Sequence, residues 1–208
     1  YYIGEFKNKK EDGQGTYVWN SGDKYIGEWK NGNRTGQGTF IWKDGAKYSG
    51  DYLDGERTGK GTINYSDGGK YTGDFLKGER HGKGTLTWPN GEKYDGDFVN
   101  NNRDGEGTYT WTSGNKYIGE WKDGNRTGQG TFIWKDGNKY FGEFYKNKMN
   151  GEGTYISGED NTMMIGEFVS NEINNGVIIF PDGFKLGVFK KNGKIEYTRV
   201  QNTNQNID

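Results

Sequence analysis

The side chains that could do chemistry in this sequence are carboxylates, and they recur at a fixed spacing. An acid follows Tyr-x-Gly in seven successive stretches, at Glu5, Glu28, Asp51, Asp74, Asp97, Glu120 and Glu143. Two carboxylates can hydrolyse a glycoside, but only when they share one cleft and have different environments. Here every acid has the same sequence neighbours. We therefore interpret the acids as structural and expect no catalytic residue and no enzymatic activity.

Metal and cofactor chemistry has little support in the sequence. Cysteine is absent and His81 is the one histidine, which disfavours a zinc site. Turns such as Lys135-Asp136-Gly137 lack the ligand count of a calcium loop. Gly36-Gln37-Gly38 has no βαβ context, so we interpret it as turn glycines and not as a dinucleotide fingerprint. The sequence predicts no metal and no cofactor.

The acids belong to a longer repeat, whose position one is the tyrosine. Glycine stands at position three, the acid at four, an aromatic residue at five, Gly-x-Gly-Thr at twelve to fifteen and an aromatic residue at eighteen, where Ser157 breaks the rule. From Tyr2 to Tyr140 this tyrosine recurs every 23 residues. About nine units are expected within residues 1–197, starting at residues 2, 25, 48, 71, 94, 117, 140, 164 and 185. The last two are irregular and are interpreted as caps, and residues 198–208 as a polar tail.

Each unit contains two short runs in which large and small or polar residues alternate. Tyr25, Gly27 and Trp29 share one face of the first run, and Gly38, Phe40 and Trp42 share a face of the second. Gly, Asn and Asp separate the runs and predict turns. We expect an all-β fold, an elongated single-layer antiparallel sheet of tandem β-hairpins. The glycines at three and fourteen should let a ring lie on the backbone, and those at twelve and twenty-one should have positive φ.

These residues resemble a known family. Tyr25-x-Gly27-x-Trp29, followed by Gly32 and Gly36-x-Gly38, is similar to the membrane occupation and recognition nexus, or MORN, repeat. The resemblance covers roughly residues 2–197. It implies a scaffold or protein-binding surface of hairpins, found in cytoskeletal or membrane-associated assemblies, and some members are proposed to bind phosphoinositides.

The aromatic face is the first candidate binding surface. In a single-layer sheet the aromatic rings either form the core or line an open groove that binds a partner helix or extended peptide. The candidate groove consists of Tyr25, Trp29, Phe40, Trp42, Tyr48, Tyr52, Tyr71, Phe75, Trp88, Tyr94, Phe98, Trp111, Tyr117, Trp121, Phe132, Trp134, Tyr140 and Phe144.

Two further surfaces are alternatives. The arginines Arg34, Arg57, Arg80, Arg103 and Arg126 recur in the hairpin turns. They form either part of a solvated charged face or a stripe that contacts anionic lipid or an acidic partner. The aliphatic run Val177, Ile178, Ile179 and Phe180 is interpreted as a cap, or alternatively as a self-association patch at a sheet end that would give a homodimer.

Bulk composition limits the partners. The formal net charge is -1, so no basic field exists to attract nucleic acid. Absence of cysteine fits a reducing compartment, and we expect a cytoplasmic location, with or without attachment to cytoskeleton or membrane. The sequence thus favours a non-enzymatic protein-binding scaffold. The alternatives are a phosphoinositide-binding module and a secreted repeat that binds carbohydrate or choline.

Overall fold

The computed structural model describes residues 1–200 and contains strands and turns there, with no helix. Consequently, no helix in this part of the chain is long and apolar enough to cross a membrane. The residues 201–208 of the predicted tail lie outside the described part. The chain divides into two units, residues Tyr1–Thr112 and the residues from Ser113 onward, and each unit is taken by itself below.

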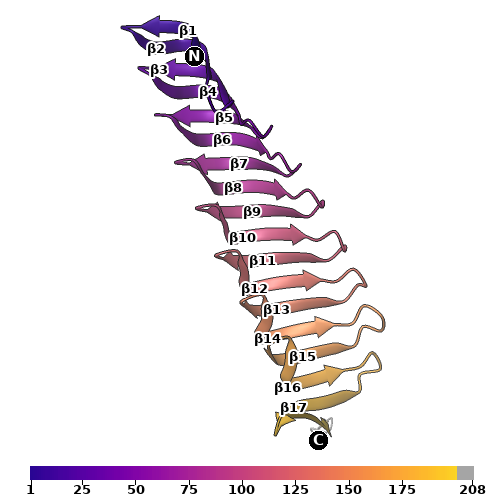
Figure 1. Ribbon diagram of the computed structural model, residues 1–208. Helices are drawn as coiled ribbons and strands as arrows, with labels where there is room; N and C mark the ends of the chain where they lie inside the picture. Colours follow the sequence, from indigo (N-terminus) through magenta and orange to yellow (C-terminus); the bar gives the residue numbers. More distant parts are fainter. Residues whose placement is uncertain (201–208) are drawn as a thin grey trace, which may run out of the picture. The chain divides into compact units, whose positions relative to one another are not determined.

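Unit 1 is one antiparallel sheet in which each strand pairs with the next along the chain (Figure 1). Its strands are β1 (Tyr2–Lys7), β2 (Lys10–Val18), β3 (Lys24–Lys30), β4 (Asn33–Ile41), β5 (Lys47–Leu53), β6 (Glu56–Asn64), β7 (Lys70–Leu76), β8 (Glu79–Thr87), β9 (Lys93–Val99) and β10 (Asn102–Thr110).

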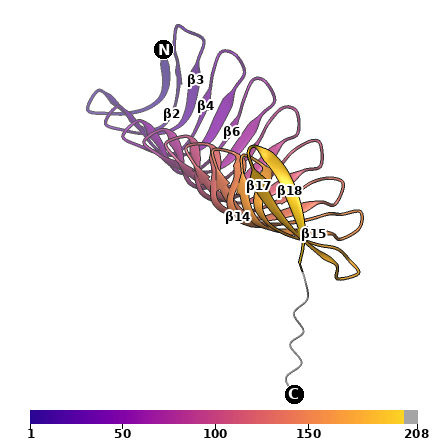
Figure 2. The same cartoon turned by 90° about the horizontal axis from the view of Figure 1, so that it is seen from below.

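Unit 2 has the same topology. Its strands are β11 (Lys116–Lys122), β12 (Asn125–Ile133), β13 (Lys139–Tyr145), β14 (Lys148–Ile156), β15 (Met163–Val169), β16 (Glu172–Ile179), β17 (Lys185–Lys191) and β18 (Lys194–Arg199). The predicted all-β fold of tandem hairpins is confirmed. Figure 2 shows how the loops of successive hairpins follow one another.

Each hairpin closes through a two-residue turn with positive φ at both positions. In the β3–β4 hairpin, Asn31 and Gly32 have φ of 49° and 87°, and Lys30 pairs with Asn33. This is the type I′ geometry, which suits the right-handed twist of the strands. Asn101 and Asn147 replace the turn glycine and keep the conformation, with φ of 68° and 70°. Asparagine adopts positive φ more readily than most residues, so the turn keeps its conformation without glycine.

The pairing places equivalent positions of neighbouring strands opposite one another. Gly27 of β3 faces Gly38 of β4, which in turn faces Gly50 of β5. The register shifts after Gly27, between β3 and β4, where Gly36 has a φ of 54°. A bulge of this kind bends the strand. In this hairpin the paired glycines therefore lie in the middle of the strands, and the bulge lies between them and the turn.

Tyrosine rings at position one form the centre of the core. Six of them, in both units, have 0% exposure: Tyr25, Tyr48, Tyr71, Tyr94, Tyr117 and Tyr140. Within each unit these tyrosines contact the position-five ring of their own hairpin, and all but Tyr94 also contact that of the next. Tyr48 lies edge-to-face against Tyr52 at 5.3 Å and against Phe75 at 5.1 Å. Such edge-to-face contacts stabilise beyond the area they bury, and they link each hairpin to its neighbour.

Candidate binding surfaces

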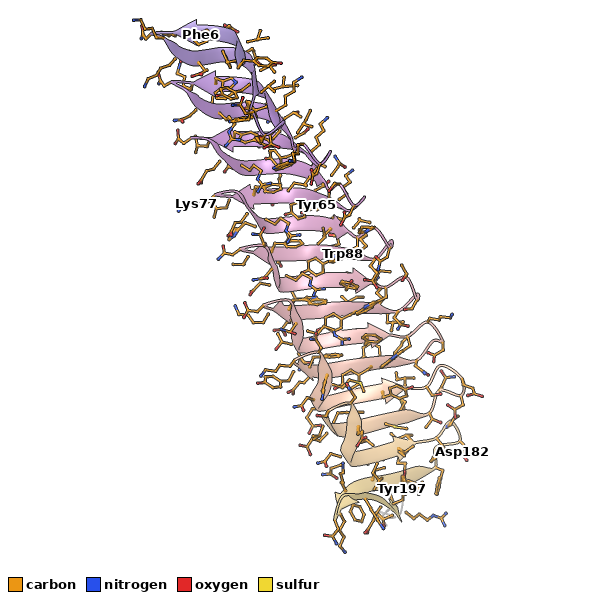
Figure 3. The ribbon with its side chains drawn as sticks, viewed as in Figure 1. Phe6, Tyr65, Lys77, Trp88, Asp182 and Tyr197 are labelled. Carbon is orange, nitrogen blue, oxygen red and sulfur yellow. The ribbon has the colours of Figure 1, made fainter. Side chains whose placement is uncertain are left out.

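The structure divides the predicted aromatic groove into buried and half-buried rings. The buried rings, at most 9% exposed, are Tyr25, Trp29, Tyr48, Tyr52, Tyr71, Phe75, Tyr94, Phe98, Tyr117, Trp121, Phe132, Tyr140 and Phe144. The half-buried ones are Phe40, Trp42, Trp88, Trp111 and Trp134. A partner can reach the second group only, because the first is covered within the chain. Tyr65, another ring at position eighteen, and Trp88 both lie at the end of the strands opposite to the turn that holds Lys77 (Figure 3).

The position-one tyrosines are fixed at both ends of the ring. The Tyr48 hydroxyl donates to the backbone carbonyl of Asp51 at 3.0 Å. The ring lies on Gly61, where a Cβ would be 2.5 Å from Cε2 of Tyr48. Burial raises the pKa of Tyr71 and Tyr140 to about 12, and it raises the pKa of Tyr25, Tyr48 and Tyr94 as well. The predicted role is confirmed for the glycine at fourteen, whereas a Cβ on the glycine at three, Gly50, would meet the backbone of Lys60 and Gly61 and the Tyr48 hydroxyl, each at 2.5 Å.

Four of the repeated arginines tie their hairpin to the next one. Arg57 lies over the rings of Tyr48 and Phe75, with its Cζ 5.5 and 5.6 Å from their centroids, and its Nη2 donates to the Gly78 carbonyl at 2.6 Å. Arg34 and Arg126 make the same bond to Gly55 and Asn147 at 2.6 Å. Four half-buried arginine side chains thus bind groups of the same chain: Arg34, Arg57, Arg80 and Arg126. Arg103 lies over the rings of Tyr94 and Tyr109. This geometry disfavours the predicted lipid stripe, which stays a prediction.

Replacing Arg57 by lysine should destabilise unit 1 by about 1–3 kcal/mol. Lysine keeps the charge but loses the planar group that stacks on Tyr48 and the fixed donor to Gly78. Urea unfolding of Arg57→Lys against wild type measures the difference. The reverse exchange at an exposed site, Lys70→Arg, is the control and should stay within about 0.5 kcal/mol. An unchanged midpoint for Arg57→Lys would show that the stacking contributes nothing.

The recurrent acids bind the backbone at the bulge. Glu28 Oε1 accepts from Gln37 N–H at 3.0 Å, Asp51 Oδ2 from Lys60 N–H at 2.8 Å, and Glu120 Oε1 from Gln129 N–H at 2.7 Å. The glycine at position twelve has positive φ in each of these cases, and its missing Cβ leaves room for the carboxylate. Glu5, Asp74 and Asp97 make the same bond, so in six hairpins one acid satisfies a donor at the bulge. Their repetition has a structural cause.

A hollow of unit 1 lies on the face opposite the buried rings. Its volume is about 840 Å³, and it extends from Gln14 on β2 to Asp95 on β9. We call it the hydroxyl groove, because position fifteen contributes Thr39, Thr62 and Thr85, whose hydroxyls pair with Ser49, Thr72 and Asp95 of the next strands. The rim carries Gln37 bonded to Asp51, Lys60 paired with Asp74 at 2.6 Å and Lys83 paired with Asp97 at 2.7 Å.

The sequence analysis missed this groove, although one signal was available. Threonine occupies position fifteen in all seven regular units, as in Thr16 and Thr131, with no turn or ring to explain it. A column of small polar residues on one face of a sheet leaves that face open.

The aliphatic run lies within unit 2. Strand β16, which contains Val177, Ile178 and Ile179, pairs with β15 on one side and β17 on the other. Ile178 is buried, and Val177, Ile179 and Phe180 are half-buried. Self-association through this run would therefore need side-chain contacts, because its backbone is already paired. The homodimer stays a prediction.

Solved structures give distant similarities only. The TCP domain of Drosophila melanogaster SAS-4, in complex with a proline-rich motif of Ana2, has a TM-score of 0.47 and 11% identity over 75% of this chain and 85% of that chain. A mutant of the TCP10 domain of Danio rerio CPAP has a TM-score of 0.30 and 11% identity over 88% and 86%. No functional conclusion follows at these scores. None of the curated proteins compared with the chain matches it.

The family comparison is decisive. The MORN repeat model matches seven consecutive segments, residues 2–24, 25–47, 48–70, 71–93, 94–116, 117–139 and 140–162. These segments start at the same residues as the first seven predicted units. The seven segments cover most of the chain, and the hairpins, ring contacts and glycine pairs described above lie in them. The protein therefore belongs to the MORN repeat family.

Proposed function

We propose that this chain is a protein-binding scaffold and that unit 1 takes an extended peptide segment of its partner in the hydroxyl groove. The observation that carries the proposal is the hollow of about 840 Å³ between β2 and β9. Its size is in the range of sites that bind ligands. The MORN repeat is in general a non-enzymatic module, which agrees with a binding role.

The chemistry of the groove favours a polar segment in extended conformation. The floor is formed by glycine pairs such as Gly50 and Gly61, so a chain can approach the sheet closely. The walls offer threonine and serine hydroxyls, which both donate and accept hydrogen bonds. Asp51, Lys60, Lys83 and Asp95 line the same hollow with balanced charge. A segment that alternates small polar and oppositely charged residues would meet both signs.

The second candidate surface is the row of half-buried rings on the other face. Trp42 contacts Phe40 at 4.9 Å, and both are accessible on one side. These rings are anchors that an apolar partner would use. Membrane binding has weaker support, because the arginines that would contact lipid are engaged with rings and carbonyls. Assembly at cytoskeleton or membrane stays a prediction.

Filling the groove should abolish partner binding. Thr72 is exposed at position two on β7, where Phe141 occupies the equivalent position of unit 2, so Thr72→Phe fits the repeat. Affinity capture from cells that express the protein, with wild type and Thr72→Phe as baits, should retain proteins that the variant loses at least about tenfold. The matched control is Thr112→Phe in an exposed turn, which should capture the same proteins as wild type.

A variant on the ring face tests the alternative binding surface. Trp42→Ala should keep the captured proteins if the groove binds them. Loss with Trp42→Ala and retention with Thr72→Phe would move the site to the ring face. Equal capture by all variants would contradict both surfaces. Circular dichroism of each variant establishes that the sheet is intact before the comparison.

A further inference from the structure

The seventh unit departs from the repeat between β14 and β15. Ser157 stands at position eighteen, where each earlier unit has an aromatic ring. The loop from Ser157 to Thr162 then joins the two strands. The other units show which side chains a ring at this position contacts.

Position-eighteen rings lie between two position-sixteen side chains. Trp134 contacts Phe132 of its own hairpin at 4.5 Å and Tyr155 of the next hairpin at 5.6 Å. In unit 1, Trp19 contacts Tyr17 and Phe40 in the same way, at 4.5 and 5.4 Å. The equivalent neighbours of Ser157 are Tyr155 and Ile178. An indole at residue 157 would therefore lie between these two side chains.

The structure has a hollow of about 510 Å³ at that place. Its apolar walls are Tyr155, Met164, Ile178 and Phe180. Tyr155, Met164 and Phe180 are half-buried, so the hollow is accessible, and Ile178 lies at its base with 8% exposure. The absence of one ring thus leaves a preformed apolar recess in an otherwise filled row.

The rim of the recess is acidic. Asp136, Glu159 and Asp160 line it, and no lysine or arginine does. Hydrogen bonding with the Ser157 side chain, together with the bonds that the N–H and hydroxyl of Thr162 donate to Asp160, lowers the pKa of the Asp160 carboxyl to about 2. Asp160 is therefore ionised at neutral pH. An apolar recess with a negative rim complements a side chain that has an apolar stem and a cationic head.

The loop is held in place before any ligand binds. Ser157 N–H donates to the Thr162 carbonyl at 2.9 Å, and Gly158 N–H donates to Asn138 Oδ1 at 2.8 Å. Gly158 is pressed against the preceding turn, since a Cβ there would be 2.5 Å from the carbonyl carbon of Gly137. A site that is already ordered loses little conformational entropy on binding.

We propose that this recess binds an arginine side chain of a partner peptide, with the stem on Tyr155, Met164 and Ile178 and the guanidinium between Asp136 and Asp160. The planar guanidinium matches carboxylates in a fork and also lies well on the ring of Tyr155 or Phe180. The site shares no residue with the hydroxyl groove, although both take a segment of a protein partner.

Restoring the missing ring should close the site. The probe is a short labelled peptide of alternating glycine and arginine, and its fluorescence anisotropy is measured with the full chain. Ser157→Trp leaves the net charge unchanged and should weaken binding at least about tenfold. Ser157→Ala controls for the lost hydroxyl and should bind within about twofold of wild type. Ser157→Trp should unfold at the same temperature as wild type or higher, because the row is filled.

A charge variant tests the rim. Asp136→Asn should weaken binding by about threefold to tenfold, since one carboxylate is lost near the guanidinium. Asp67→Asn is the matched control, because Asp67 has the same repeat position and makes the same turn bond, Oδ1 accepting from Gly69 N–H at 2.8 Å, as Asp136 makes to Asn138. A glutamate version of the peptide should not bind.

Two results would overturn the proposal. Binding to Ser157→Trp as tight as to wild type would show that the recess is not used. Equal loss with Asp67→Asn and Asp136→Asn would show general attraction between a basic peptide and an acidic surface. Thr72→Phe should bind the arginine peptide normally, so the groove proposal and the recess proposal fail independently.

Discussion

Gly61→Ala is expected to destabilise unit 1 by about 3 kcal/mol, more than an ordinary glycine substitution in a strand. The added Cβ would lie 2.5 Å from Cε2 and 2.6 Å from Oη of Tyr48. That ring is fully buried between Tyr52 and Phe75, and its hydroxyl is bonded to the Asp51 carbonyl, so it has no free space to move into. Overpacking a filled core typically costs about 1–3 kcal/mol, and here the backbone of β6 must shift as well. Urea unfolding at neutral pH measures the loss.

Two controls isolate the steric cause. Gly68 has a φ of 94° and no heavy atom within 4 Å of its added Cβ, so Gly68→Ala should cost only the backbone strain of about 1–2 kcal/mol. Tyr48→Leu removes the ring atoms that the new methyl group meets. In that background Gly61→Ala should cost less than about 1 kcal/mol, a coupling that a double-mutant cycle detects. If Gly61→Ala were as costly with Leu at residue 48 as with Tyr, contact with the ring would not explain the glycine.

The local structure of the repeat follows from its sequence. Alternation in Lys24–Trp29 and in Gly38–Trp42 predicts two strands, and Asn31-Gly32 predicts the tight turn between them. The structure has these strands, and both turn residues have positive φ. The predicted positive φ at positions twelve and twenty-one is confirmed at Gly36 and Gly45. These features depend on residues that are close in the sequence, so the periodicity of one sequence is enough to predict them.

Contacts between hairpins could not be predicted in the same way. Arg57 bonds to a carbonyl that is 21 residues further along the chain, and its position in a turn suggested a free surface cation. Its contact with Gly78 depends on how the bulge after Gly50 bends the sheet toward the next hairpin. The rings were interpreted as an open groove. Unit 1 has one hollow above Thr39, Thr62 and Thr85 and a smaller one on the ring face, lined in part by Phe40, Trp42 and Tyr52, so the aromatic groove stays a prediction.

The recess at Ser157 is an intermediate case. The sequence shows both the missing ring and the extra residue in the unit that begins at Tyr140. It does not show whether the neighbours collapse into the space. In the structure the space stays open, and the loop beside it is fixed by the bond from Gly158 N–H to Asn138 Oδ1.

Raising the pH above 10 should unfold the protein in one cooperative step. Tyrosine ionises at about 10 in an unfolded chain. In the folded chain burial raises the pKa of Tyr52, Tyr71 and Tyr140 to about 12, so the folded state retains protons that the unfolded state has lost. Their contribution to stability is complete below pH 10 and is lost as the pH rises from 10 towards 12. Each such group lowers the free energy of unfolding by about 1.4 kcal/mol per pH unit in this window.

Tyrosinate absorbance and circular dichroism, followed together from pH 8 to about pH 12, test this expectation, and both signals should change in the same transition. Tyr48→Phe provides the matched variant. It should lose about 1 kcal/mol at neutral pH, because the bond from its hydroxyl to the Asp51 carbonyl is gone. Its stability should nevertheless fall less steeply above pH 10, because one proton fewer distinguishes the folded from the unfolded state. Ionisation of all tyrosines with the sheet intact would contradict the argument, since it would mean that water reaches the rings at position one without opening the hairpins.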